Sequence, residues 1–152
     1  MNITNEIVRE VIENKDIYVE FQPIYSLNTK KVIGLEALAR GDYMGEIVSP
    51  YFLFNYAKKD SSILYVDRLC REKAMCAYAE ERSDAMLYVN FETSVLNDVI
   101  PGNGEILRTA AEYGIAPENI VIELNESNVK DSYNLLRFVD FYRSNNFLIA
   151  LD

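Results

Sequence analysis

The residues in this sequence best suited to chemistry are Glu36 and Arg40, which follow the short apolar run 32–35. A carboxylate can hold a hard divalent cation, and an arginine presents a planar fork of donors that fits a phosphate. The same arrangement, an apolar run that ends in an oxygen-bearing side chain, recurs at Asn90, Glu123 and Asp152. The recurrence indicates a metal site close to a cation that can bind phosphate.

Each of these residues taken alone has a simpler explanation. A single polar residue after an apolar run is commonly a solvated strand end or the cap of the next helix. Four oxygen donors in equivalent places shift the interpretation toward a site for a divalent metal ion.

The elements that must position these residues alternate between strands and helices. Apolar periodicity predicts strands at 17–25, 31–39, 86–89, 119–122 and 147–151, and helices at 3–14, 51–58, 62–82, 105–113 and 129–143. A further helix is expected to begin at Thr93, and Pro23 is expected to end or bulge the first strand. The first two strands are predicted to form a hairpin-like pair, and the later ones a parallel sheet buried on both faces. Ligands of such sheets gather at the carboxyl ends of the strands.

Composition excludes several classes of function. The chain has 152 residues, a net charge of −9 and no histidine. The negative charge argues against binding to nucleic-acid polymers or anionic membranes. Without histidine, Ser-His and Cys-His nucleophiles and the usual zinc sites are excluded, so any metal must be held by oxygen, which favours magnesium, manganese or calcium.

The sequence contains no apolar run long enough to span a bilayer and no signal peptide at its start, so a cytoplasmic location is expected. The two cysteines, Cys70 and Cys76, lie six positions apart on a predicted helix and therefore face in different directions. They are expected to be buried free thiols.

Five short segments occur in order along the chain: Phe21-Gln22-Pro23-Ile24, Gly34-Leu35-Glu36-Ala37-Leu38-Ala39-Arg40, Val89-Asn90, Glu123-Leu124-Asn125-Glu126-Ser127 and Ile149-Ala150-Leu151-Asp152. Together they closely resemble the EAL family of cyclic di-GMP phosphodiesterases, which is named after the tripeptide at 36–38. The tripeptide alone is a weak signal, whereas five ordered motifs are a strong one. The resemblance covers this whole chain but only about the first half of such a domain.

The resemblance implies a (β/α)8 barrel, of the TIM type, with one antiparallel strand. We therefore expect residues 1–152 to be a single truncated EAL domain, an α/β partial barrel with an antiparallel first strand and the C-terminal strands missing. The fifth predicted strand would then be an exposed sheet edge. Such a chain would have to pair with another chain, swap segments or be stabilised by dimerisation, and a homodimer is expected.

The resemblance also assigns roles by position. Four residues resemble the ligands of the catalytic magnesium or manganese: Glu36, Asn90, Glu123 and Asp152. Two resemble contacts to the substrate, cyclic di-GMP: Gln22 and Arg40, the latter to a phosphate. Glu126 resembles a residue that steadies the active-site loop and is tied to dimerisation; the alternative is a charged residue at a helix start.

These assignments imply hydrolysis of cyclic di-GMP to linear pGpG. The family pattern continues with a second aspartate, a lysine, a glutamate and a glutamine that the 152 residues do not contain, so this chain alone is expected to be inactive. It also carries Phe91-Glu92 where the family usually has Leu-Ser, and Asn125 where it usually has Thr. The alternatives are a non-catalytic cyclic di-GMP receptor or dimerisation module, and a scaffold that binds nothing.

Overall fold

The computed structural model describes residues 2–97, 103–125 and 132–151. Its strands are β1 (Ile17–Tyr25), β2 (Val32–Tyr43), β3 (Glu46–Val48), β4 (Met86–Phe91), β5 (Ile120–Leu124) and β6 (Leu148–Leu151). Its α-helices are α1 (Asn5–Glu13), α2 (Pro50–Lys59), α3 (Ile63–Glu81), α4 (Glu105–Glu112) and α5 (Ser132–Ser144), and two short 3-10 helices are η1 (Thr93–Asn97) and η2 (Pro117–Asn119).

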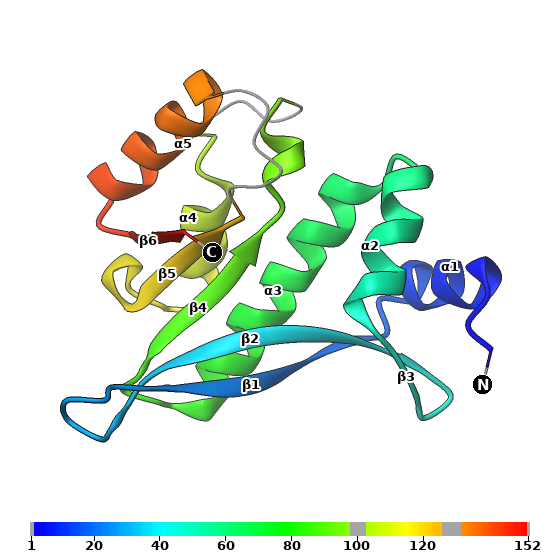
Figure 1. The fold of residues 1–152 in the computed structure, drawn as a ribbon, viewed down its shortest axis with the longest axis horizontal. Coiled ribbons are helices and arrows are strands. Elements are labelled where there is room, and N and C mark those ends of the chain that lie inside the picture. The colour runs from blue at the N-terminus through cyan, green and yellow to red at the C-terminus, as the bar shows by residue number, and fades with distance from the viewer. Residues whose placement is uncertain (1, 98–102, 126–131, 152) are drawn as a thin grey trace.

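The six strands form one mixed sheet in the order β1–β2–β4–β5–β6, with β3 paired to the far end of β2 (Figure 1). β1 runs antiparallel to β2, whereas β2, β4, β5 and β6 are mutually parallel. The predicted hairpin-like start, the antiparallel first strand and the parallel remainder are therefore confirmed. In the described part of the chain β6 pairs with β5 alone and forms the predicted sheet edge. Closure of a TIM-type barrel stays a prediction.

Helices cover one face of this sheet. Alternate residues of β4 and β5 (Leu87, Val89, Phe91, Ile120, Ile122 and Leu124) are buried in one core with residues of α3, α4 and α5. The intervening residues of β4 point to the opposite face of the sheet. On that face Met86 of β4 is 36% exposed and Leu148 of β6 is 44% exposed. The prediction of a sheet buried on both faces is therefore met only in part by the described residues: helices cover one face, and on the other Val121 is buried although Met86 and Leu148 are exposed.

A second apolar cluster fixes the amino-terminal part of the sheet. Val8 and Val11 of α1 pack with Leu53 of α2 and Val66 of α3, all of them buried. The side chain of Thr4 accepts a hydrogen bond from the backbone N–H of Ile7 and so caps α1. This cluster anchors the end of the hairpin formed by β1 and β2.

Three local features differ from the sequence-based expectation. β2 continues to Tyr43, because after its parallel partner ends it still pairs with β1 and then with β3. β3 was not predicted; it follows a two-residue turn, Met44-Gly45, with φ of 54° and 86°. Such turns usually contain Asn-Gly, so a methionine there gives little sequence signal.

Pro23 does not end β1, since it pairs with Leu35 and the irregularity in register falls at residues 24 and 25. β1 is the first strand of the sheet order, and an edge strand tolerates a residue without an N–H donor.

Two smaller expectations also change. On α5, Leu136 is 60% exposed, whereas Phe138 is buried. Thr93 begins a 3-10 helix in place of an α-helix. Cys70 and Cys76 are free as predicted, but they are half-buried. No helix in the described ranges is long and apolar enough to cross a bilayer.

Candidate metal and phosphate site

Glu36 on β2 and Asn90 on β4 are in contact on the face of the sheet that the described helices leave uncovered. The register pairs Glu36 with Tyr88, so Asn90 lies two residues further along the neighbouring strand. The side-chain Nδ2 of Asn90 donates a hydrogen bond of 3.3 Å to Oε1 of Glu36. Two residues that are 54 positions apart in the sequence thus meet at one place.

Glu123 on β5 is the next residue across the sheet. Its Cα is the register partner of Asn90, so both side chains leave the same face. Glu123 is half-buried, as is Glu36, whereas Asn90 is exposed. Three oxygen-bearing side chains from three neighbouring strands therefore lie on one face, with Asn90 in register with Glu123 and in contact with Glu36, whose register partner is Tyr88.

The sequence suggested that these residues directly follow their strands. In the structure they lie within the strands. β4 runs through Phe91 and β5 through Leu124, so each polar residue is followed by one further residue that pairs in the sheet. On β2 the parallel pairing stops at Ala37 opposite Val89, one residue after Glu36. Glu36 is therefore close to the carboxyl end of the parallel sheet although its strand continues.

Two of the predicted site residues, Asp152 and Glu126, lie outside the described residues. Of the four predicted metal ligands, the structure therefore describes Glu36, Asn90 and Glu123. No group of three or more acidic, cysteine or histidine residues in metal-binding proximity occurs within the described ranges. The described cluster consists of two carboxylates and one amide.

The donor types of this cluster suit a hard cation such as magnesium, manganese or calcium, which prefer carboxylate and amide oxygens. In the structure Asn90 presents its NH₂ group to Glu36. A cation between the two side chains would need the amide turned over, so that the carbonyl oxygen faces it. Such a turn would replace the hydrogen bond between Asn90 and Glu36 by an oxygen ligand for the cation.

The two predicted substrate contacts lie on the first two strands. Gln22 on β1 is the register partner of Glu36 and is exposed beside it. Arg40 is four residues beyond Glu36 on β2, which places their Cα atoms about 13 Å apart. The Nε of Arg40 lies 2.9 Å from Oε2 of Glu20, and its Nη1 donates to the carbonyl oxygen of Ala39. The structure therefore brings Gln22, but not Arg40, next to the carboxylate.

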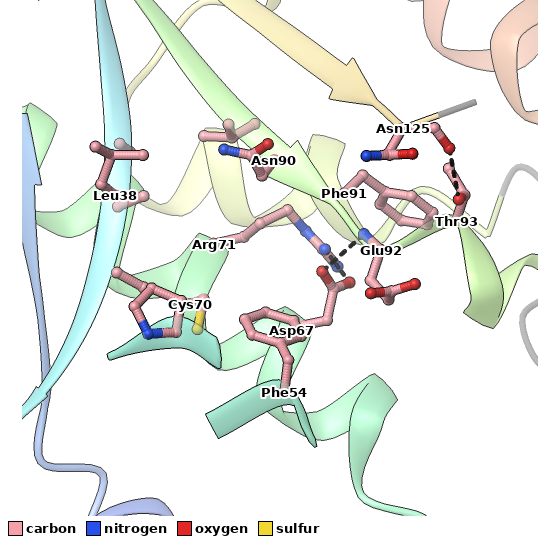
Figure 2. Close-up of a pocket in the computed structure, with 15 residues that line it drawn as sticks. Leu38, Phe54, Asp67, Cys70, Arg71, Asn90, Phe91, Glu92, Thr93 and Asn125 are labelled. Atoms are coloured by element: carbon pink, nitrogen blue, oxygen red, sulfur yellow. Dashed lines mark hydrogen bonds and ion pairs between the residues drawn. The ribbon is translucent and has the colours of Figure 1, made fainter. Parts of the chain in front are cut away.

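A cavity of about 270 Å³ opens beside Asn90, between β2, β4 and helices α2 and α3 (Figure 2). Its walls are largely apolar, with Leu38, Phe54 and Phe91 among them, and its polar lining includes Asp67 and Asn125. The candidate site therefore consists of the three polar residues Glu36, Asn90 and Glu123 and an adjacent cavity with largely apolar walls.

A buried ion network forms the floor of this cavity. The guanidinium of Arg71 on α3 pairs with Asp67 one turn earlier and lies 2.9 Å from Oε2 of Glu105 on α4. Asp67 also accepts a 3.1 Å hydrogen bond from the backbone N–H of Glu92, two residues after Asn90. Burial raises the pKa of Asp67, an effect that the neighbouring charge of Arg71 opposes. The network ties α3 and α4 to the segment that carries Asn90.

Two further contacts hold that segment. The Thr93 hydroxyl donates a 2.9 Å hydrogen bond to the backbone carbonyl of Asn125, which joins the segments after β4 and β5 (Figure 2). The carboxylate of Glu92 lies 3.3 Å from Nζ of Lys58 and accepts a bond from the Ser94 backbone. Burial favours a raised pKa for Glu92, but the bonds from Ser94 and the charge of Lys58 outweigh it and lower the pKa.

Asp67, Arg71 and Tyr88 also belong to this region, although they were not among the residues predicted from the sequence. A signal was available for the first two, since an acid and an arginine four residues apart fall on the apolar stripe of a predicted helix. Tyr88 was read only as a strand residue, although its alternation with Asn90 places it on the same face.

Comparison with known proteins shows the family and the fold of this chain. The chain matches the EAL domain family over residues 5–152. It is 30% identical over 152 residues to "Probable cyclic di-GMP phosphodiesterase PdeB" of Escherichia coli (strain K12), with 95% of this chain and 29% of that protein covered. It is 27% identical to the "Uncharacterized EAL-domain containing protein YkuI" of Bacillus subtilis (strain 168), with 90% and 34% covered. The chain thus spans about a third of these relatives.

Solved structures show the same fold. The Bacillus subtilis YkuI protein, determined in complex with substrate c-di-GMP and calcium, superposes with a TM-score of 0.77 at 26% identity, over 99% of this chain and 38% of that one. A standalone EAL protein from Vibrio cholerae O395 in its c-di-GMP-bound form gives a TM-score of 0.73 at 31% identity, over 90% and 56%. With the ordered motifs, the shared sheet and the family match over residues 5–152, this chain belongs to the EAL domain family.

Proposed function

We propose that this chain carries the metal-binding and phosphate-binding residues of a domain that hydrolyses cyclic di-GMP to linear pGpG with magnesium or manganese. The observation that supports the proposal most directly is the contact between Asn90 and Glu36, 3.3 Å apart, with Glu123 in register beside Asn90. Three of the four expected metal ligands thus lie on one face of the sheet.

In this proposal Glu36, Asn90 and Glu123 hold the cation, and Asp152 completes the set. A divalent cation held there would lower the pKa of a bound water and offset the negative charge that develops on a phosphodiester. Two carboxylates with one amide in place of a third keep the local negative charge smaller beside an anionic substrate. Gln22 orients the ligand through its amide, from its place beside Glu36.

Arg40 binds a phosphate of the ligand through charge-assisted hydrogen bonds from its guanidinium. It is the only lysine or arginine in the six described strands, and its side chain retains 22% exposure. At about 13 Å along the strand from Glu36, it would hold a part of the ligand away from the cation and so fix the ligand's orientation.

We further propose that the 152-residue chain turns over little substrate alone, because the later residues of the family pattern are not among its residues. A partial barrel, Glu126 as a loop-steadying residue, a homodimer and a cytoplasmic location belong to the same proposal. Within it, a non-catalytic receptor is the second candidate, and it differs in one measurable respect: it binds the ligand without turnover.

The test combines binding with product analysis. Calorimetry with cyclic di-GMP in the presence of manganese is expected to show binding that Arg40→Ala weakens by about tenfold or more, since a charged hydrogen bond is worth roughly 1.5–3 kcal/mol. The matched control is Glu81→Gln, an exposed residue at the far end of α3.

Chromatography of the same mixtures distinguishes the remaining outcomes. Rapid formation of linear pGpG by the isolated chain would contradict the proposed inactivity while supporting the assigned chemistry. Tight binding without product supports the receptor. Absence of binding together with absence of any manganese-induced thermal shift would overturn the proposed function.

A further inference from the structure

The carboxylate of Glu20 forms an ion pair with the guanidinium of Arg40. The antiparallel register pairs Glu20 with Leu38 and Tyr18 with Arg40, so Glu20 and Arg40 are diagonal neighbours on one face of the hairpin. Oε2 of Glu20 lies 2.9 Å from Nε of Arg40. The Nη1 of Arg40 also donates to the carbonyl oxygen of Ala39 at 2.9 Å. Two of the three guanidinium nitrogens are thus engaged within the described chain.

The charge balance of this face makes that pairing consequential. Strand alternation and register place Glu20 on the same face as Glu36 and, across β4, Glu123. Arg40 is the sole cationic side chain of the six described strands. Among the described strand residues, an anionic ligand that approaches this face therefore meets one positive charge, and a carboxylate already lies against it.

We propose that Glu20 attenuates the affinity of the site for a phosphate-containing ligand by competing for the guanidinium of Arg40. The inference rests on the proposed function of Arg40 as a phosphate contact and adds to it a residue outside the five family-like segments. Glu20 also lies two residues before Gln22, so its carboxylate sits between the two substrate contacts.

The ion pair between Glu20 and Arg40 is exposed enough for a ligand phosphate to displace the Glu20 carboxylate. The side chain of Glu20 is 51% exposed and that of Arg40 is 22% exposed, so the carboxylate of Glu20 can rotate away from Arg40 into solvent when a phosphate binds. A partly exposed ion pair contributes little net free energy, because each charge is well solvated when separated. The displacement therefore weakens ligand binding without abolishing it.

The experiment compares cyclic di-GMP affinities by calorimetry for the wild-type chain, Glu20→Gln, Arg40→Ala and the double variant. Glu20→Gln keeps the size of the side chain and removes its charge. We expect it to bind about two- to fivefold more tightly than wild type, the range that a partly exposed pair supports. In the Arg40→Ala background the same substitution is expected to have no more effect than Glu81→Gln, which removes one negative charge far from the site.

Ionic strength supplies a readout that a merely structural role would not move. The ratio of the wild-type dissociation constant to that of Glu20→Gln is expected to approach one at high salt, because screening weakens exposed charge pairs. Unfolding midpoints of the two proteins are expected to agree closely, since an exposed pair of this kind adds little stability.

Four results would overturn the inference. Weaker binding by Glu20→Gln would make Glu20 an orienting partner of Arg40 and not a competitor. An equal gain in the Arg40→Ala background would reduce the effect to net charge. If wild type binds and Arg40→Ala weakens binding while Glu20→Gln changes nothing, the proposed function stands and this inference fails. If no variant binds, both fail together.

Discussion

The aromatic ring of Tyr88 lies directly over the backbone of Gly34, on the face of the sheet that carries Glu36 and Asn90. A Cβ at position 34 would be 2.3 Å from Cε2 of Tyr88 and 3.4 Å from the carbonyl oxygen of Met86. The ring therefore uses the space that the missing side chain leaves. Tyr88 is in register with Glu36 and lies two residues before Asn90, so the packing of Tyr88 on Gly34 is directly adjacent to the candidate metal ligands.

Gly34→Ala is expected to destabilise the fold by about 1–3 kcal/mol, because the added methyl group forces the ring of Tyr88 out of its place. Denaturant unfolding measures the loss. A second substitution, Tyr88→Ala, removes the obstacle, so the double variant should lose clearly less than the sum of the two single variants. Strict additivity would show that the ring and the glycine are not coupled.

Glu36→Gln is expected to weaken manganese binding strongly. Loss of groups that merely support a metal ligand costs about 10- to 100-fold in affinity, so loss of a ligand itself should cost at least as much. The measurement is the manganese-dependent rise in the unfolding midpoint, which vanishes when the folded state no longer binds the ion. Asn90→Ala should act in the same direction, while Glu81→Gln should leave the rise intact. An unchanged rise in Glu36→Gln would place the ion elsewhere.

Arg71→Met is expected to cost about 3–5 kcal/mol, because it leaves the carboxylate of Asp67 buried without its cation. Arg71 is 2% exposed and also pairs with Glu105, so no solvent replaces the lost partner. Thermal unfolding measures the effect. Arg68→Met is the matched control on the same helix, since it takes no part in this network, and should cost much less.

The pKa of Glu92 predicts a specific pH dependence. Bonds from Ser94 and the charge of Lys58 lower this pKa in the folded state despite partial burial. A lowered carboxyl pKa contributes stability above the unfolded value, about 4.3, which is lost as the pH falls through the folded value. Glu92→Gln is therefore expected to be less stable than wild type at pH 7, by about 1 kcal/mol or less. The difference should shrink below pH 4; a constant difference from pH 7 to pH 3 would contradict it.

Cys70 is expected to be unreactive toward alkylating reagents. Burial raises the pKa of its thiol to about 12, and the charge of Asp67 acts in the same direction. Since only the thiolate reacts, its alkylation at pH 8 should be on the order of a thousandfold slower than that of an ordinary thiol. The Cys76→Ser variant isolates Cys70, and iodoacetamide labelling followed by mass spectrometry gives the rate. Unfolding in urea should restore normal reactivity, whereas fast labelling of the folded protein would contradict the raised pKa of this thiol.

Local sequence patterns were sufficient for most of the elements. The boundaries of β1 and β6 and the position of Gly114 after α4, with a φ of 67°, follow from β-branched residues, apolar alternation and glycine chemistry. These properties depend on near neighbours in the chain, which is why the sequence displays them. The ordered segments also indicated Glu36, Asn90 and Glu123 as candidate ligands, but only through the family resemblance; their common face follows from the register of β2, β4 and β5.

The tertiary structure decided what depends on pairing between distant strands. That β2 extends past Glu36 follows from its partners β1 and β3, whose register the apolar pattern of β2 does not encode. The burial of Arg71 with Asp67 and Glu105, and the pairing of Arg40 with Glu20, depend on contacts between separate elements. A charged side chain has the same letter in the sequence whether water or another charge surrounds it, so only the folded chain distinguishes the two.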